Sequence, residues 1–180
     1  YDFANSKKLI EANLSANHNS SLMLIDILSE ANWDESGKIL LRNLNVKNIE
    51  AESKIISALN HKKIKSTSEN NGLIINKIQD EVSRYNWIIT SLLDLTEDSL
   101  YSELCTLLEL ELDYAVLRIF KLTSLIYNEN EISKIINIIQ DKNSDQNILA
   151  IELVDILIEV ELKEYLIPVI DNLSYDEKNL

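Results

Sequence analysis

The sequence contains very little glycine, proline or cysteine. Its 180 residues include two glycines, one proline and one cysteine, whereas average usage is about 7% glycine and about 5% proline. Folds with many hairpins or long ordered loops need glycine and proline at their turns, so this shortage excludes such folds. The single cysteine, Cys105, excludes a disulfide within the chain, and its apolar surroundings predict a buried, unreactive thiol.

Positive charge and long apolar runs are also scarce. The net charge is −13. Residues 1–65 carry nine basic and eight acidic residues, whereas residues 66–180 carry eight basic and twenty-two acidic residues. A nucleic-acid-binding surface needs clustered Lys and Arg, so we expect no nucleic-acid partner. No run of about 18 apolar residues occurs, so we expect no membrane span in this segment.

Apolar residues recur at spacings of three and four along the chain, which is typical of amphipathic helices. The clearest stripe lies within residues 147–171 and consists of Ala150, Leu153, Val154, Leu157 and Ile158. Acidic residues occupy the opposite side, namely Glu152, Asp155 and Glu159. The pattern predicts a helix with one face in a core and the other in water.

The same spacing predicts helices joined by short polar connections. We expect them over residues 2–16, 20–32, 37–44, 48–60, 69–95, 98–127, 130–140, 145–160 and 162–172. The two long central helices are expected to bend or split at a polar point, either residues 84–86 or residues 111–113. Pro168 has no N–H to donate, so we expect the last helix to break near Leu166 or to restart at Pro168.

Short connections make consecutive helices antiparallel. Residues 22–28 and 151–157 share a similar Leu/Ile pattern around an aspartate, which favours repeated helix pairs. The sequence therefore predicts an all-α fold, specifically an irregular α-solenoid of stacked antiparallel helix pairs, a HEAT/armadillo-like superhelix. We expect residues 1–180 to form a single HEAT-like domain. Because the chain begins with Tyr1, we expect it to be a fragment of a longer protein.

The residues that usually carry chemistry are dispersed. His18 and His61 lie far apart in polar connections, and the two glycines are isolated, so neither a metal centre, a catalytic triad nor a phosphate-binding loop is indicated. Glu109 and Asp113 share a helix face, which leaves weak cation binding open, although a solvated acidic face is the simpler interpretation. We therefore predict no catalytic, cofactor-binding or metal-binding residues.

Aromatic and acidic residues are the candidates for binding a partner. Aromatic side chains supply large contact areas at interfaces, and core packing at helix junctions is the alternative interpretation. The predicted partner-binding residues are Trp33, Trp87, Glu109, Asp113 and Tyr114. Arg118, within an apolar stripe, is expected to form a structural ion pair with Asp94 or Asp155.

Four elements from Val116 onward follow one family pattern. They are Arg118-Ile119-Phe120 with Leu122 and Leu125, Tyr127 before an acidic turn and Ile132, the N-x-x-A-x-E-L-x-D-x-L frame of residues 147–157, and an ending with Leu162, Leu166 and Pro168. This pattern resembles the HEAT-repeat region attached to ATP:ADP-antiporter-like transporters of the major facilitator type, which is also found beside cyclic-nucleotide-binding domains. The resemblance implies an accessory cytosolic module tethered to a membrane or sensory domain.

A helical-repeat surface without a catalytic constellation predicts a non-enzymatic protein-interaction scaffold or regulatory module. The acidity of residues 66–180 predicts a basic protein partner. Two alternatives remain open, a sensory domain that binds a ligand between helices and a hydrolase or lyase built on a helical-repeat fold. We expect no cofactor, and a cytoplasmic location that includes the cytosolic face of a membrane.

Overall fold

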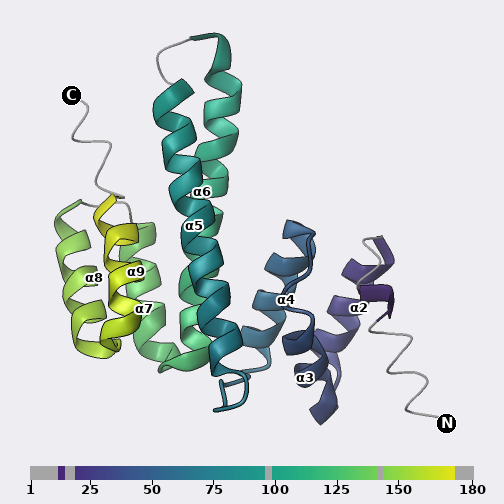
Figure 1. Ribbon diagram of the computed structural model, residues 1–180. Coiled ribbons are helices and arrows are strands. Elements are labelled where there is room, and N and C mark those ends of the chain that lie inside the picture. The colour runs from purple at the N-terminus through teal and green to yellow at the C-terminus, as the bar shows by residue number, and fades with distance from the viewer. Residues whose placement is uncertain (1–11, 15–18, 96–98, 142–143, 173–180) are drawn as a thin grey trace. The chain divides into compact units, whose positions relative to one another are not determined.

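Helices make up the regular structure of the chain (Figure 1). The computed structural model describes residues 12–14, 19–95, 99–141 and 144–172, and no strand occurs among them. The all-α prediction is confirmed, whereas most of the helix expected over residues 2–16 lies outside the described residues. None of the described helices has the length and apolar character that crossing a membrane requires.

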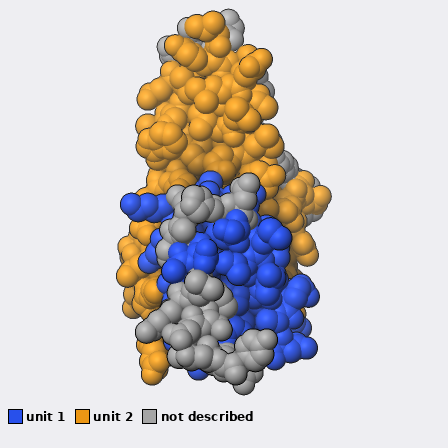
Figure 2. Space-filling model, turned by 90° about the vertical axis from the view of Figure 1, so that its right-hand side faces the viewer, with its two compact units in different colours: residues 1–66 blue, residues 67–180 orange. Residues whose placement is uncertain are grey.

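Two compact units divide the chain at a change in charge. Unit 1 comprises residues 1–66 and unit 2 comprises residues 67–180 (Figure 2). The nine basic and eight acidic residues of unit 1 nearly cancel, whereas unit 2 carries eight basic and twenty-two acidic residues. The acidic character of the chain therefore belongs to unit 2.

Unit 1 consists of three mutually packed helices in its described part. They are α2 (Asn19–Glu30), α3 (Asp34–Arg42) and α4 (Ile49–His61). Asn48 caps α4, because its Oδ1 accepts a hydrogen bond from the N–H of Ala51 at 2.9 Å. The core of this unit includes Ile25, Leu28, Ile39, Leu40, Ile55 and Leu59.

Gly37 lies inside a helix instead of beginning one. The helix expected from residue 37 begins at Asp34. A Cβ atom at Gly37 would lie 2.6 Å from Cδ1 of Ile64, a residue that follows α4. The glycine therefore leaves room for the Ile64 side chain against α3, and this side chain would have to shift if residue 37 carried a Cβ atom.

Unit 2 is built around a long helical hairpin. This hairpin consists of α5 (Asn71–Leu95) and α6 (Ser102–Ile126), with the short 3-10 helix η1 (Ser99–Tyr101) before α6. The helices that follow are α7 (Glu129–Gln140), α8 (Ser144–Leu157) and α9 (Val160–Asn172). Helices α6, α7, α8 and α9 pack in chain order, and α9 also packs against α5. Helices α5 to α9 therefore form a closed ring of contacts.

The hairpin is longer than the helices that surround it. Helices α5 and α6 have 25 residues each, about 37 Å, whereas helices of 12 to 14 residues such as α7, α8 and α9 span about 20 Å. The outer part of the hairpin extends beyond these three helices (Figure 1). Residues 115–125 of α6 are mostly buried, whereas none of residues 102–114 is buried.

Both long helices are continuous, so of the predicted bend or split at residues 84–86 or 111–113 the split is wrong. The polar residues at these points form ion pairs. Arg84 Nη1 donates to Glu81 Oε1 at 2.9 Å, and Arg118 Nη2 donates to Glu111 Oε1 at 2.7 Å. Their charges stabilise the helices at these positions instead of ending them.

Helix α9 continues through Pro168, so the predicted break near Leu166 or restart at Pro168 is also wrong. Proline removes one backbone hydrogen bond, to the carbonyl of the residue four positions earlier. That residue, Glu164, is exposed, as is Pro168, so water can satisfy the carbonyl. On the other side, Leu166, Val169 and Ile170 are buried, and their packing holds the helix across the proline.

The stripe predicted for α8 is confirmed. Ala150, Val154 and Ile158 are buried, and Leu153 and Leu157 are partly buried. The acidic residues predicted for the other side are exposed, namely Glu152, Asp155 and Glu159. The amphipathic spacing in this segment therefore identified the core face correctly.

Tyr85 connects the first and last helices of the ring. Its hydroxyl donates a hydrogen bond to the carbonyl of Val169 at 3.0 Å, and its side chain is fully buried. Burial raises the pKa of Tyr85 above its usual range, because the phenolate would lose its hydration. At pH values below the pKa that Tyr85 has in the unfolded chain, its protonated side chain stabilises the fold. This stabilisation is lost as the pH rises toward the pKa of Tyr85 in the folded chain.

We expect Tyr85→Phe to lower the free energy of unfolding by about 1 kcal/mol near pH 8, because a buried hydrogen bond is lost. Above the unfolded-state pKa of about 10, the stability of the wild type falls by about 1.4 kcal/mol per pH unit relative to the variant, so the order should reverse near pH 11. Urea unfolding near pH 8 and near pH 11 measures both differences.

The control is Tyr114→Phe, which changes an exposed hydroxyl on α6 and should alter stability by less than about 0.5 kcal/mol at either pH. An effect of Tyr85→Phe that is equal at the two pH values would show that the phenol is not shielded from water in the folded state.

Candidate functional site

The five predicted partner-binding residues fall in both units. Trp33 lies in unit 1, in the connection between α2 and α3, and its side chain is partly buried. Its carbonyl accepts hydrogen bonds from the N–H of Ser36 at 2.9 Å and from the hydroxyl of Ser36 at 2.7 Å. The position matches the alternative interpretation, in which this aromatic residue packs at a helix junction.

The other four predicted residues lie on the hairpin of unit 2. The contact between Glu81 and Arg118 sets the register of the two antiparallel helices and places Trp87 level with Asp113 and Tyr114. Trp87 is 64% exposed and Tyr114 is 58% exposed. These two aromatic side chains are therefore available to a partner at about the same height on the hairpin.

Glu109 and Asp113 share one flank of α6, as predicted from their spacing, but Tyr114 does not lie there. Successive residues of a helix are about 100° apart, so Tyr114 lies about 140° around the helix from Glu109. It shares its flank with Leu107, seven residues earlier. The structure therefore separates the predicted residues of α6 into an acidic flank and an apolar one.

Most of the exposed apolar surface on the hairpin is not among the residues predicted from the sequence. This surface includes Leu93, Leu100, Tyr101, Leu104, Leu107 and Leu110 in addition to Trp87 and Tyr114. A signal for it exists in the sequence. Residues 85–117 contain seven acidic residues and no Lys, Arg or His. The outer part of the hairpin therefore combines exposed apolar side chains with charge of one sign.

A buried cluster of charges lies at the base of this outer part. The Glu81 carboxylate is fully buried and receives Nε of Arg118 at 2.8 Å and Nη1 of Arg84 at 2.9 Å. Lys77 Nζ lies 3.8 Å from Glu81, and Arg118 also reaches Glu111 at 2.7 Å. The pair of Glu81 and Arg118 links α5 to α6 through side chains that water scarcely reaches, whereas Arg84 and Glu111 are each 35% exposed.

The predicted partners of Arg118 are therefore wrong, although the predicted kind of interaction is confirmed. Asp94 is exposed, and Asp155 pairs with Lys163 at 2.8 Å. Burial alone lowers the pKa of Arg118, but hydrogen bonds and charge attraction from Glu81 and Glu111 outweigh it and raise the pKa overall. Arg118 stays charged, so its role is to hold the hairpin together rather than to transfer protons.

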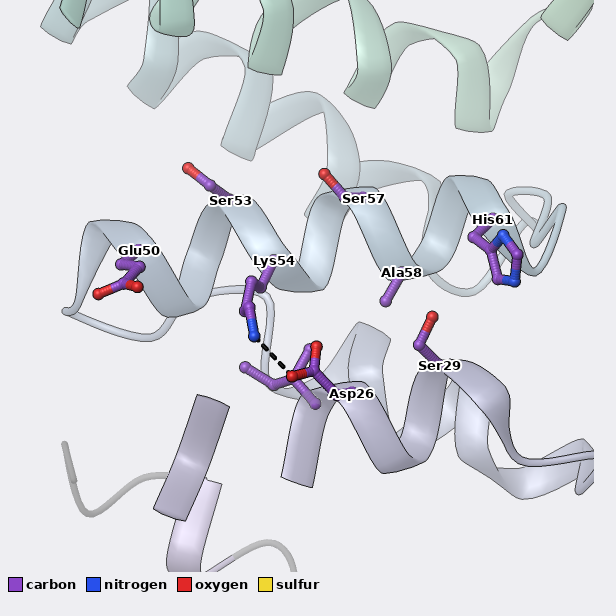
Figure 3. Close-up of a pocket in the computed structure, with 9 residues that line it drawn as sticks. Asp26, Ser29, Glu50, Ser53, Lys54, Ser57, Ala58 and His61 are labelled. Carbon is purple, nitrogen blue, oxygen red and sulfur yellow. Dashed lines mark hydrogen bonds and ion pairs between the residues drawn. The ribbon is translucent and has the colours of Figure 1, made fainter. Parts of the chain in front are cut away.

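Unit 1 contains an open groove between α2 and α4, with a volume of about 460 Å³ (Figure 3). Most of the residues that line it are polar, including Ser29, Ser53 and Ser57. Two of its charged groups pair with each other, because Lys54 Nζ lies 2.7 Å from Asp26 Oδ2. The groove therefore offers hydroxyl groups, this ion pair and the carboxylate of Glu50.

The groups considered for chemistry lie in separate surroundings. Every residue that lines the groove beside His61 belongs to unit 1, and His61 Nε2 lies 3.7 Å from Glu30 Oε1. Cys105 lies on α6 and is partly exposed, so the prediction of a buried thiol is wrong, because α6 protrudes there. His18 lies outside the described residues. Within the described part of the chain, no three His, Cys, Asp or Glu side chains cluster as metal ligands would.

Comparison of the chain with protein-family models, with curated proteins and with solved structures gives no match. The resemblance of residues 116–172 to a HEAT-repeat region therefore stays a prediction.

We expect Glu81→Ala to lower the free energy of unfolding by about 3–5 kcal/mol, because it leaves Arg118 buried without its main counter-ion. Glu131→Ala is the matched control, since Glu131 pairs with Lys134 at 2.9 Å on the surface of α7. That change should cost less than about 1 kcal/mol. Urea unfolding followed by circular dichroism measures both. Equal losses would show that the buried cluster contributes no more than a surface ion pair.

Proposed function

We propose that this chain is a non-enzymatic protein-interaction module, a scaffold or regulatory accessory domain, and that the outer part of its α5–α6 hairpin binds a basic partner. The observation that carries the proposal is the combination of exposed Leu, Trp and Tyr side chains with an acid-only segment, residues 85–117. Large exposed apolar side chains on one protruding element are typical of a protein-binding surface.

The rigidity of the hairpin supports this proposal. Its base is enclosed by α7 and α9, and the buried Glu81 cluster ties α5 to α6. A surface held in place before binding loses less conformational entropy on association than a flexible one. The protruding part can therefore bind a partner without rearrangement of the ring below it.

The HEAT-like arrangement and the neighbouring domain also belong to the proposal. Helices α6 to α9 pack in chain order, as the helices of an α-solenoid do, although the contact of α9 with α5 closes them into a ring that an open solenoid lacks. The sequence pattern of residues 116–172 resembles the HEAT region of antiporter-like transporters and cyclic-nucleotide-binding proteins. On that basis we place the module in the cytoplasm, tethered beside a membrane or sensory domain.

The two alternative functions receive less support from the described residues. A ligand-binding domain would use the groove between α2 and α4, but that groove is open and its Asp26 and Lys54 pair with each other. A hydrolase or lyase would need titratable groups together in one cleft. The groove does bring Asp26, Glu50, Lys54 and His61 together, but Asp26 and Lys54 neutralise each other. The protruding hairpin is the more distinctive feature.

We expect that the double substitution Leu104→Asp/Leu107→Asp, hereafter the hairpin variant, no longer binds the partners of the wild-type protein. Both leucines are exposed, so the fold should persist. Cross-linking in the cells that produce the protein, followed by mass spectrometry, should detect a reproducible partner set with the wild type. Recovery of that set should fall at least about tenfold with the hairpin variant, because two charges replace interface side chains.

The matched control is Ile156→Asp/Val160→Asp, hereafter the control variant. It introduces the same charges at residues that are 77% and 66% exposed, away from the hairpin. The control variant should recover the partner set at the wild-type level. Equal recovery by the wild type and the hairpin variant would show that the hairpin is not the binding surface.

A further inference from the structure

One flank of α6 has the spacing of a coiled-coil seam. What we call the outer stripe consists of Leu100 in η1, just before α6, and of Leu104, Leu107, Glu111 and Tyr114 in α6. These residues follow each other at intervals of four, three, four and three residues. All are exposed except Glu111, whose side chain is 35% exposed. Intervals of this kind keep one line of side chains facing a partner helix, here over about one and a half heptads of α6. The outer stripe therefore matches the surface that a second helix would need.

The charge around the outer stripe selects among possible partners. Glu103 borders it, Glu111 lies within it, and no basic residue occurs between Arg84 and Arg118. A second copy of this chain would bring two acid-only hairpins together, and like charges across an interface are unfavourable. An anionic membrane surface would repel the hairpin for the same reason. A positively charged helix is favoured.

We infer that the outer stripe binds a basic amphipathic α-helix of a partner protein, which packs along α6 as one strand of a short coiled coil. This inference rests on the proposed function and names the partner class of the same site. The leucines and Tyr114 supply the apolar seam, and the surrounding carboxylates attract Lys and Arg beside the seam of the partner.

Glu111 determines the register of that complex. Arg118 Nη2 holds Glu111 Oε1 at 2.7 Å, so the carboxylate has a fixed position within the apolar seam. A single polar residue in such a seam favours the one alignment that gives it a partner. A Lys or Arg of the bound helix lies opposite Glu111, and other alignments leave the carboxylate facing apolar side chains.

Three synthetic peptides of about three heptads test this inference. The first has leucines along one face and lysines beside them. The second replaces those lysines with glutamates, and the third keeps the composition of the first but scatters its leucines around the helix. Fluorescence anisotropy should give a dissociation constant on the order of 10 µM for the first peptide. Its binding should weaken at high salt, and the other two peptides should bind at least about tenfold more weakly.

Matched variants locate the contact. The hairpin variant should weaken binding of the lysine peptide at least about tenfold, whereas the control variant should not. Glu111→Gln should weaken it about fivefold, and Glu109→Gln, on the other flank of α6, by less than about twofold. Circular dichroism before each titration confirms that the variants are folded.

Several outcomes would overturn the inference. Binding of the scattered peptide as tightly as the amphipathic one, or equal effects of Glu109→Gln and Glu111→Gln, would indicate attraction by charge alone. A dimer in sedimentation that dissociates in the hairpin variant would make a second copy the occupant. If no peptide binds while the hairpin variant still loses its partners in cells, the basic helix is wrong and the proposed function stands. If neither effect is seen, the proposed function fails as well.

Discussion

The buried carboxylate of Glu81 is the constraint on which the arrangement of unit 2 depends. A fully buried charge must be compensated, and here Arg118 and Arg84 supply direct hydrogen bonds at 2.8 and 2.9 Å. Since Arg118 belongs to α6 and Glu81 to α5, this pairing allows one register of the hairpin. That register decides which residues enter the ring of helices and which extend beyond it. The outer stripe is exposed because the shorter helices end near the level of this cluster.

Much of the secondary structure could be predicted from spacing, because so few residues of this chain can turn or break a helix. The predictions that were wrong concern polar residues inside the long helices and the proline inside α9. Arg84 and Glu111 look like weak points of long helices, although each forms an ion pair within its own helix, Arg84 with Glu81 in α5 and Glu111 with Arg118 in α6. Pro168 was interpreted as a break, yet the buried side chains around it hold α9 together. The ion pair of Arg118 was expected from its apolar surroundings, but its partner depends on the register of two helices and cannot be read from α6 alone.

The candidate site was predictable only in part. Trp87, Glu109, Asp113 and Tyr114 do lie on the hairpin, but the spacing of leucines in α6 looks the same in its buried and exposed halves. What separates the halves is the length of α7 and α9, which end before the hairpin does. The absence of basic residues from 85 to 117 was a usable signal of the exposed half. Burial of leucines within the fold of the chain does not require charges of a single sign, so this charge pattern points to another use of the segment.

The return of α9 to α5 also has a consequence for how unit 2 comes apart. In an open row of helices, an end helix contacts one neighbour and can fray without disturbing the others. In unit 2 the first and last helices contact each other, and the hydroxyl of Tyr85 donates a hydrogen bond to the backbone of α9. Detaching any one helix exposes apolar surface on two others, so the ring favours loss of structure in a single cooperative step. Partner binding at the hairpin would then stabilise all five helices together.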